Sequence, residues 1–155
     1  MSNKYNFASE EIEWQRIEDD SGGYPCDYET AVLGADPEKG RLDLIVRWQP
    51  NSYCHFHRHL ADTTVVVLEG EQHIIEVAAD GSYGEHKVRA KGTIASSPGG
   101  DAHMEYAGPE GATVFFALHA ADGRLFEMLD KDMNILSSST VAEMAAGTAG
   151  FGLTG

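Results

Sequence analysis

Hydrophobic and polar residues alternate along much of the middle of the chain, which is the pattern of β-strands with one buried face. The clearest case is residues 42–48, whose apolar side chains fall on one face: Leu42, Leu44, Val46 and Trp48. Residues 63–68 are β-branched or apolar almost throughout, so both faces of that strand must be covered. No long amphipathic pattern competes, and we expect an all-β chain.

Turn residues divide this pattern into short segments about every ten positions. Gly, Pro and Asp mark the turns, and the segments between them predict strands at 12–17, 28–33, 42–48, 63–68, 72–78, 86–89, 93–96, 103–107, 112–120 and 124–129. Short strands at this spacing are typical of a β-sandwich or barrel.

The pattern changes beyond residue 136. Ser139 or Thr140 can cap a short helix there, with Glu143 in its first turn. At 155 residues the chain has the length of one domain. We expect a flexible tail over residues 1–10, one β-barrel over 11–136 and a partly helical tail over 137–155.

Charge and composition narrow the function classes. The chain has 11 Lys and Arg against 25 Asp and Glu, a formal charge of −14, which disfavours nucleic acid and anionic membranes as partners. Neither a signal peptide nor a membrane-spanning apolar run is recognisable. The two cysteines, Cys26 and Cys54, are too few for a disulfide framework. We therefore expect a cytoplasmic protein with reduced thiols, acting on a small molecule.

Three of the seven histidines stand at alternate positions: His55, His57 and His59. Alternate side chains leave an extended strand on the same face. Imidazole is the commonest protein ligand for divalent transition metals, so this row predicts a metal site. Cys54 has the opposite parity and is expected to point away from the imidazoles.

A second informative stretch runs from Gly92 to His103. A predicted strand enters the turn Pro98-Gly99-Gly100, and His103 stands just beyond it. Such a turn can fold His103 back toward the first row of histidines.

These two stretches resemble the two signature motifs of the cupin superfamily. The second motif (Gly, five residues, Pro-x-Gly, two, His, three, Asn) is matched by Gly92, Pro98, Gly100 and His103 at every spacing, and Ala107 replaces its final Asn. The resemblance implies a single-domain, RmlC-like jelly-roll barrel, the cupin double-stranded β-helix, followed by the short helical tail.

The first motif (Gly, five residues, His-x-His, three or four, Glu, six, Gly) fits in two registers. His55 with His57 brings Asp62 to the acidic position, but Gly70 then arrives one residue late. His57 with His59 brings Thr63 to the acidic position and Gly70 to the position of the final Gly. Asn51, which tolerates left-handed backbone, then replaces the leading Gly. We favour the second register, with Asp62 as the rival.

In the favoured register the resemblance implies three metal ligands: His57, His59 and His103. The usual glutamate is absent, so we expect three neutral donors and positions left for O₂ or a chelating substrate. The chain looks similar to small cupins around the diketone-cleaving and dihydroxyacetophenone dioxygenases, which implies Fe(II), with Zn, Ni or Mn as alternatives. Cupins are often dimers, and we expect a homodimer.

Five further residues are candidates for the pocket. His55 and Glu105 are the candidate acid–base residues. Glu105 shares strand parity with His103, so an unexpected ligand is the alternative role for it. Tyr53, Thr63 and Phe115 are expected to line the substrate pocket. The late strand alternates Phe115 with Phe116, and only one of the two can face the barrel.

The sequence favours a non-haem iron dioxygenase that acts on a small diketone or hydroxyaryl ketone. Two rivals remain: a non-catalytic metal-binding or sensory cupin, and an isomerase or hydrolase that uses Zn, Ni or Mn with Glu105 or His55 as base. The fold itself discriminates among them poorly, because function lies in the site.

Overall fold

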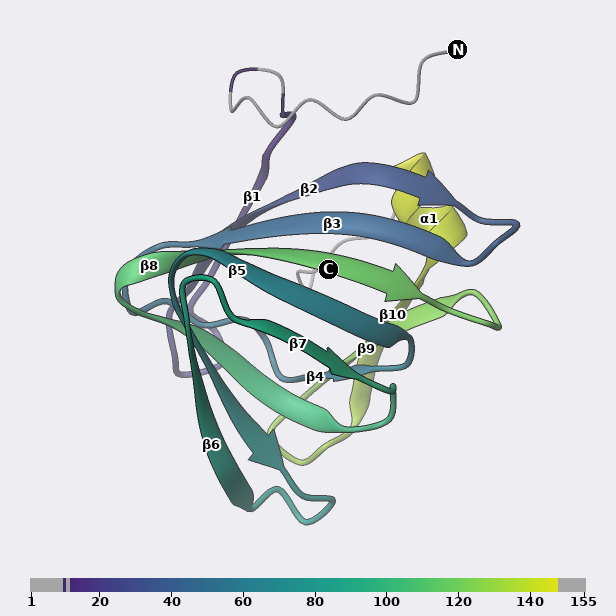
Figure 1. The fold of residues 1–155 in the computed structure, drawn as a ribbon. Coiled ribbons are helices and arrows are strands. Elements are labelled where there is room, and N and C mark those ends of the chain that lie inside the picture. Colours follow the sequence, from purple (N-terminus) through teal and green to yellow (C-terminus); the bar gives the residue numbers. More distant parts are fainter. Residues whose placement is uncertain (1–9, 11, 148–155) are drawn as a thin grey trace.

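A computed structural model describes residue 10 and residues 12–147 of the chain. These residues form antiparallel strands and one short helix (Figure 1). The elements are β1 Gln15–Asp19, β2 Cys26–Asp36, β3 Arg41–Trp48, β4 His57–His59, β5 Asp62–Val77, β6 Tyr83–Ala90, β7 Ile94–Ser97, β8 Ala102–His119, β9 Arg124–Leu129, β10 Ile135–Thr140 and α1 Val141–Ala146. The predicted all-β class is confirmed.

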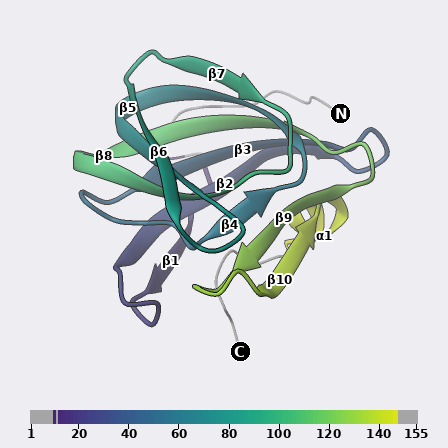
Figure 2. The same ribbon diagram turned by 90° about the horizontal axis from the view of Figure 1, so that it is seen from below.

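Two long strands, β5 and β8, pair along most of their length and belong to both layers of the barrel. The second half of β8 pairs with β3, and its start pairs with β4. One layer therefore runs β1-β2-β3-β8-β5-β7, and the other runs β10-β9-β4-β8-β5-β6. The sheet curls on itself as a jelly-roll barrel (Figure 2), which is the predicted fold.

Each long strand bends at the place where the sequence predicts a turn between two shorter strands. Gly70 and Gly111 lie together at this bend, with φ of 70° and 80°. A Cβ atom on Gly70 would approach the carbonyl oxygen of Gly111 to 2.0 Å. Because glycine tolerates both the positive φ and the close approach, the strands turn the corner without separating.

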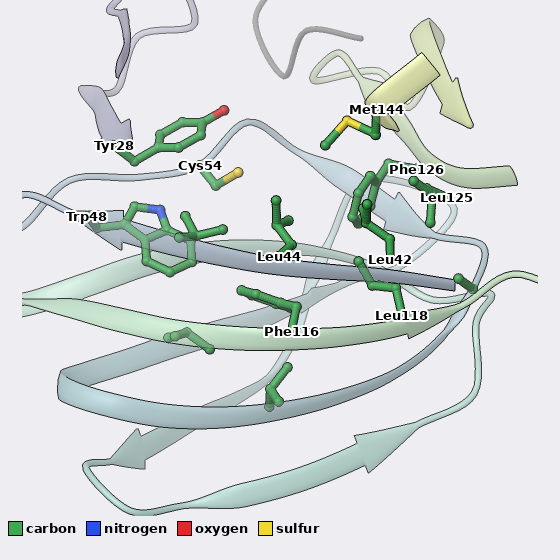
Figure 3. Close-up of a cluster of buried hydrophobic side chains, with 14 of the residues drawn as sticks. Tyr28, Leu42, Leu44, Trp48, Cys54, Phe116, Leu118, Leu125, Phe126 and Met144 are labelled. Carbon is green, nitrogen blue, oxygen red and sulfur yellow. The ribbon is translucent and has the colours of Figure 1, made fainter. Parts of the chain in front are cut away.

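The core lies between the two layers and is built from the inward faces of β3 and β8 (Figure 3). The four alternating apolar residues of β3 are all buried, with Leu42 fully removed from solvent. From β8 they meet the inward side chains Val114, Phe116 and Leu118. Burying a side chain of this size stabilises the fold by roughly 1.5–3 kcal/mol.

The C-terminal part adds an edge strand and a short helix to the barrel. β10, which the strand pattern does not predict, pairs with β9, and the predicted barrel boundary at residue 136 falls inside it. The Thr140 hydroxyl accepts a hydrogen bond from the Glu143 backbone N–H, so Thr140 is the N-cap of α1. Val141 and Met144 pack into the core. The predicted tail over residues 1–10 lies, except for Glu10, outside the described residues.

Helix α1 is the only helix in the described part of the chain, and it is far too short to cross a bilayer.

Candidate metal centre

Four side chains from two neighbouring strands converge inside the barrel. His57 and His59 come from β4, and His103 and Glu105 come from β8. Strand alternation places each pair on one face, and the antiparallel register sets His57 directly opposite His103. One potential ligand atom from each residue lies within 4.8 Å of all the others, so the four can reach a single ion.

The distances define a compact group. His57 Nε2 lies 3.0 Å from both His59 Nε2 and His103 Nε2. Glu105 Oε1 lies 2.8 Å from His103 Nε2 and 3.6 Å from the Nε2 atoms of the other two. Three ring nitrogens and one carboxylate oxygen therefore surround one point.

The other ring nitrogen of two histidines is held by a hydrogen-bond acceptor. His57 Nδ1 donates to the His55 carbonyl oxygen at 2.7 Å. The Thr63 hydroxyl donates to the Ala61 carbonyl at 3.0 Å, so it accepts from His59 Nδ1 at 3.2 Å. In the neutral form of each ring the proton then lies on Nδ1 and Nε2 offers its lone pair to the common point, which is the tautomer that metal binding requires.

The group combines two neutral imidazoles, His59 and His103, with an ionised carboxylate. Burial opposes protonation of the third ring, His57, but Cys54 and Glu105 raise its pKa well above the usual value. Burial lowers the pKa of His59 to about 3, against the pull of Glu105, and burial also lowers the pKa of His103. Burial opposes ionisation of Glu105, but its contacts with the rings of His103, His57 and His59 hold its pKa well below the usual range. This donor set suits Fe, Zn, Ni or Mn.

The carboxylate comes from Glu105, for which the sequence leaves two roles open. The sequence favours three neutral donors and leaves Glu105 open as a base or as an unexpected ligand, and the structure places Glu105, which is 3% exposed, among the potential ligands. The available signal is its shared parity with His103 on one strand. A divalent ion held here would carry a net charge of +1 with its ligands rather than +2.

The favoured motif register agrees with the backbone. Asn51 adopts the expected left-handed conformation, with φ of 58°, and Gly70 also has a positive φ. Thr63 is buried beside His59. Asp62 is exposed and lies outside the four-residue group, so the rival register loses its carboxylate.

His55 is buried beside the group but does not join it. Its Nε2 lies 2.8 Å from Asp19 Oδ2, and its Nδ1 lies 3.3 Å from the Tyr28 hydroxyl. The prediction that His55 lines the pocket with His57 needs an extended strand, and β4 begins only at His57.

The parity prediction for Cys54 is wrong for the same reason. Cys54 lines a small internal cavity of about 20 Å³ together with Tyr28, His57, His59 and Glu105. Figure 3 shows its side chain directed into the barrel near Tyr28.

Two predicted pocket residues lie elsewhere. Tyr53 stacks on Tyr106, with ring centroids 4.8 Å apart, and Tyr106 projects from the face of β8 opposite to Glu105. Phe115 lines an outer groove beside Trp14 and is not an interior residue. Its neighbour Phe116 has the inward parity.

A pocket of about 80 Å³ adjoins the metal-binding group and is lined by His59, His103 and Glu105. Its remaining wall is Thr63, Val65, Ile74, Glu76, Lys87, Arg89, Ser97, Pro98, Asp101 and Phe116. A larger groove of about 690 Å³ passes Asp62 and His119. None of the four potential ligands lines that groove, so we place the site at the smaller pocket.

Solved structures share the whole architecture at low sequence identity. An RmlC-like cupin protein from Ralstonia eutropha JMP134 is 16% identical, with a TM-score of 0.67 over 92% of this chain and 83% of that one. A putative acetylacetone dioxygenase from Methylibium petroleiphilum PM1 is 12% identical (TM-score 0.69, coverage 95% and 96%). An acetylacetone dioxygenase from Acinetobacter johnsonii is 16% identical (TM-score 0.65, coverage 96% and 95%). These likenesses show a cupin fold.

No curated protein matches the sequence. The ChrR cupin-like domain, a family model, matches residues 3–122. This span covers β1 to β8 and all four potential metal ligands. The chain therefore belongs to the ChrR cupin-like family of the cupin superfamily.

Proposed function

We propose that the protein is a metal-dependent dioxygenase that cleaves a small β-dicarbonyl compound or hydroxyaryl ketone able to chelate the metal. The observation that carries this proposal is the buried group of three histidines and Glu105, with a pocket on one side. Structural similarity to acetylacetone dioxygenases along nearly the whole chain supports it.

The protein's own residues account for binding and protection. His57, His59, His103 and Glu105 would hold the iron(II) ion, which would supply Lewis acidity toward an enolate and electrons for the reaction with O₂. These four residues would leave positions on such an ion for a bidentate ligand. Val65, Ile74 and Phe116 give the pocket an apolar wall, which excludes water from the chelated enolate.

Oxygen uptake tests the proposal. Protein loaded anaerobically with Fe(II) is mixed with acetylacetone or with a hydroxyaryl ketone in air-saturated buffer. We expect O₂ uptake together with formation of carboxylic acid products, and loss of both on chelation or in His103→Ala. Verified Fe(II) occupancy without uptake across such a panel would reject this function.

One observation favours a second candidate, a non-catalytic zinc-binding module. Three histidines and one carboxylate complete a tetrahedral zinc shell with protein ligands alone, as in structural zinc sites. Elemental analysis of the protein as isolated separates the two functions. One tightly held zinc per chain, with no turnover after exchange to iron, favours the module. An anaerobic product would instead indicate an isomerase or hydrolase.

A further inference from the structure

Arg89 differs from the other cationic side chains in the described part of the chain. Every other described Lys or Arg has a carboxylate oxygen within 4.0 Å. Arg89 has no such partner among the described residues. Its Nη1 lies 3.5 Å from the Gln72 side-chain oxygen, which is a neutral acceptor at the limit of hydrogen-bond distance. In a chain with a net charge of −14, an unpaired guanidinium is unexpected.

The position of Arg89 places this charge beside the metal-binding group. Arg89 is the most buried residue of β6, and it lines the pocket with His59, His103 and Glu105. Burial lowers the pKa of Arg89, while the nearby Glu105 raises it. A guanidinium stays protonated despite such a shift, so the pocket keeps a fixed positive charge.

The second cation of the pocket is already neutralised. Lys87 Nζ lies 3.0 Å from Glu76 Oε1 and 3.8 Å from Glu85 Oε2. Arg89 is therefore the available anion-binding group on this wall. A half-buried guanidinium loses hydration, and an anion bound in the pocket would offset that loss.

We propose that Arg89 binds a carboxylate of the substrate, so that the substrate is a β-dicarbonyl compound that also bears a carboxylate. This inference rests on the proposed function for the assignment of the dicarbonyl end to the metal. A planar guanidinium can hold a carboxylate through two parallel N–H···O bonds, which fixes both its position and its orientation. Neutral diketones would fill only the metal end of the pocket.

Anaerobic calorimetry with three probes tests the role of Arg89 without any turnover. The probes are acetylpyruvate, its uncharged methyl ester and acetylacetone, each titrated into Fe(II)-loaded protein. We expect acetylpyruvate to bind about ten- to a hundredfold tighter than the ester, the range of a charge-assisted hydrogen-bonded pair. The preference should shrink as salt is added. Equal affinity for acid and ester in the wild-type protein would overturn the proposal.

Variants test whether Arg89 is the source of the preference for the acid over the ester. In Arg89→Gln the acid should bind no tighter than the ester, while affinity for the ester stays within about twofold. Arg89→Lys should retain part of the preference, because it keeps the charge but loses the fork. Arg124→Gln is the matched control, since Arg124 pairs with Asp122 at an exposed site, and it should behave as the wild type. A preference that survives in Arg89→Gln contradicts the assignment.

The two proposals fail separately. Acid preference without oxygen uptake would reject the dioxygenase and keep the anion site on Arg89. Oxygen uptake with acetylacetone but no acid preference would reject the anion site alone.

Discussion

Glu105 Oε1 lies 2.8 Å from His103 Nε2, and the two residues stand two positions apart on the same face of β8. This contact brings a carboxylate to the histidine group from β8. In the first motif the glutamate position is Thr63, which lies in β5. The equivalent motif position, Thr63, instead holds the Nδ1 proton of His59. The donor chemistry is thus completed by a different strand.

Removing the Glu105 charge should weaken metal binding. Glu105→Gln keeps the shape of the side chain but replaces an anionic donor with a weaker neutral one, and we expect a roughly hundredfold loss in affinity for Zn²⁺ or Fe²⁺. Competition with a chromophoric chelator measures it. Asp62→Asn is the control and should bind as the wild type, because Asp62 is exposed outside the group. The reverse ranking of the two variants would restore the rival register.

Thr63 should act through His59 rather than on the metal. Thr63→Val is nearly isosteric and removes the acceptor of the His59 Nδ1 proton, so the ring is no longer held in its ligand tautomer. We expect about tenfold weaker metal binding. Thr63→Ser, which keeps a hydroxyl, should restore most of it. Unchanged affinity in Thr63→Val would show that the hydrogen bond does not orient His59.

The motif glycines should differ in their tolerance to alanine. In Gly70→Ala the new Cβ meets backbone that cannot move aside, and we expect a loss of about 3 kcal/mol or more in unfolding free energy. Gly92 has a similar φ of 87° but open space around it. Gly92→Ala should therefore cost only the left-handed strain, about 1–2 kcal/mol. Urea denaturation of both variants checks this order.

Asp19 should stabilise the fold in a pH-dependent way. Hydrogen bonds from Ser21 and His55 lower its pKa from 3.8 to about 2. A carboxyl with a depressed pKa stabilises the folded state above its unfolded pKa and loses this contribution as the pH falls toward the folded value. Asp19→Asn, whose amide oxygen can still accept, should lower the unfolding free energy at pH 7 by about 1–2 kcal/mol.

Denaturation at several pH values tests the sign for Asp19. The gap between wild type and variant should be constant from pH 7 to about 5 and narrow below about 4. A gap that widens on acidification would show that the Asp19–His55 contact does not favour the ionised carboxyl.

Much of the site follows from spacing alone, and the failures have one physical cause. His57, His59 and His103 stand on strands close to those that the sequence predicts, so alternation and the Pro98 turn are sufficient to bring them together. The predictions for His55 and Cys54 assume that the alternation extends upstream. The backbone before His57 is not part of a strand, so the alternation of side chains between two faces does not apply to His55 and Cys54.

Only the tertiary structure shows which of Phe115 and Phe116 faces the interior of the barrel. Both faces of β8 carry apolar residues, so hydrophobicity cannot tell the interior from the outer groove. Pairing of Leu44 opposite Phe116 shows which face meets the core. Arg89 lies in an exposed strand with no motif, and its importance depends on partners that only the folded chain defines.

The pairing of β4 with β8 also links metal binding to folding. His57 and His103 are 46 residues apart in sequence, and a contact across such a separation forms late because the loop must first close. The unfolded chain therefore has no preformed site, and the free energy of metal binding adds to that of folding. A bound ion should slow unfolding more than it speeds refolding, so the metal would increase the kinetic stability of the barrel.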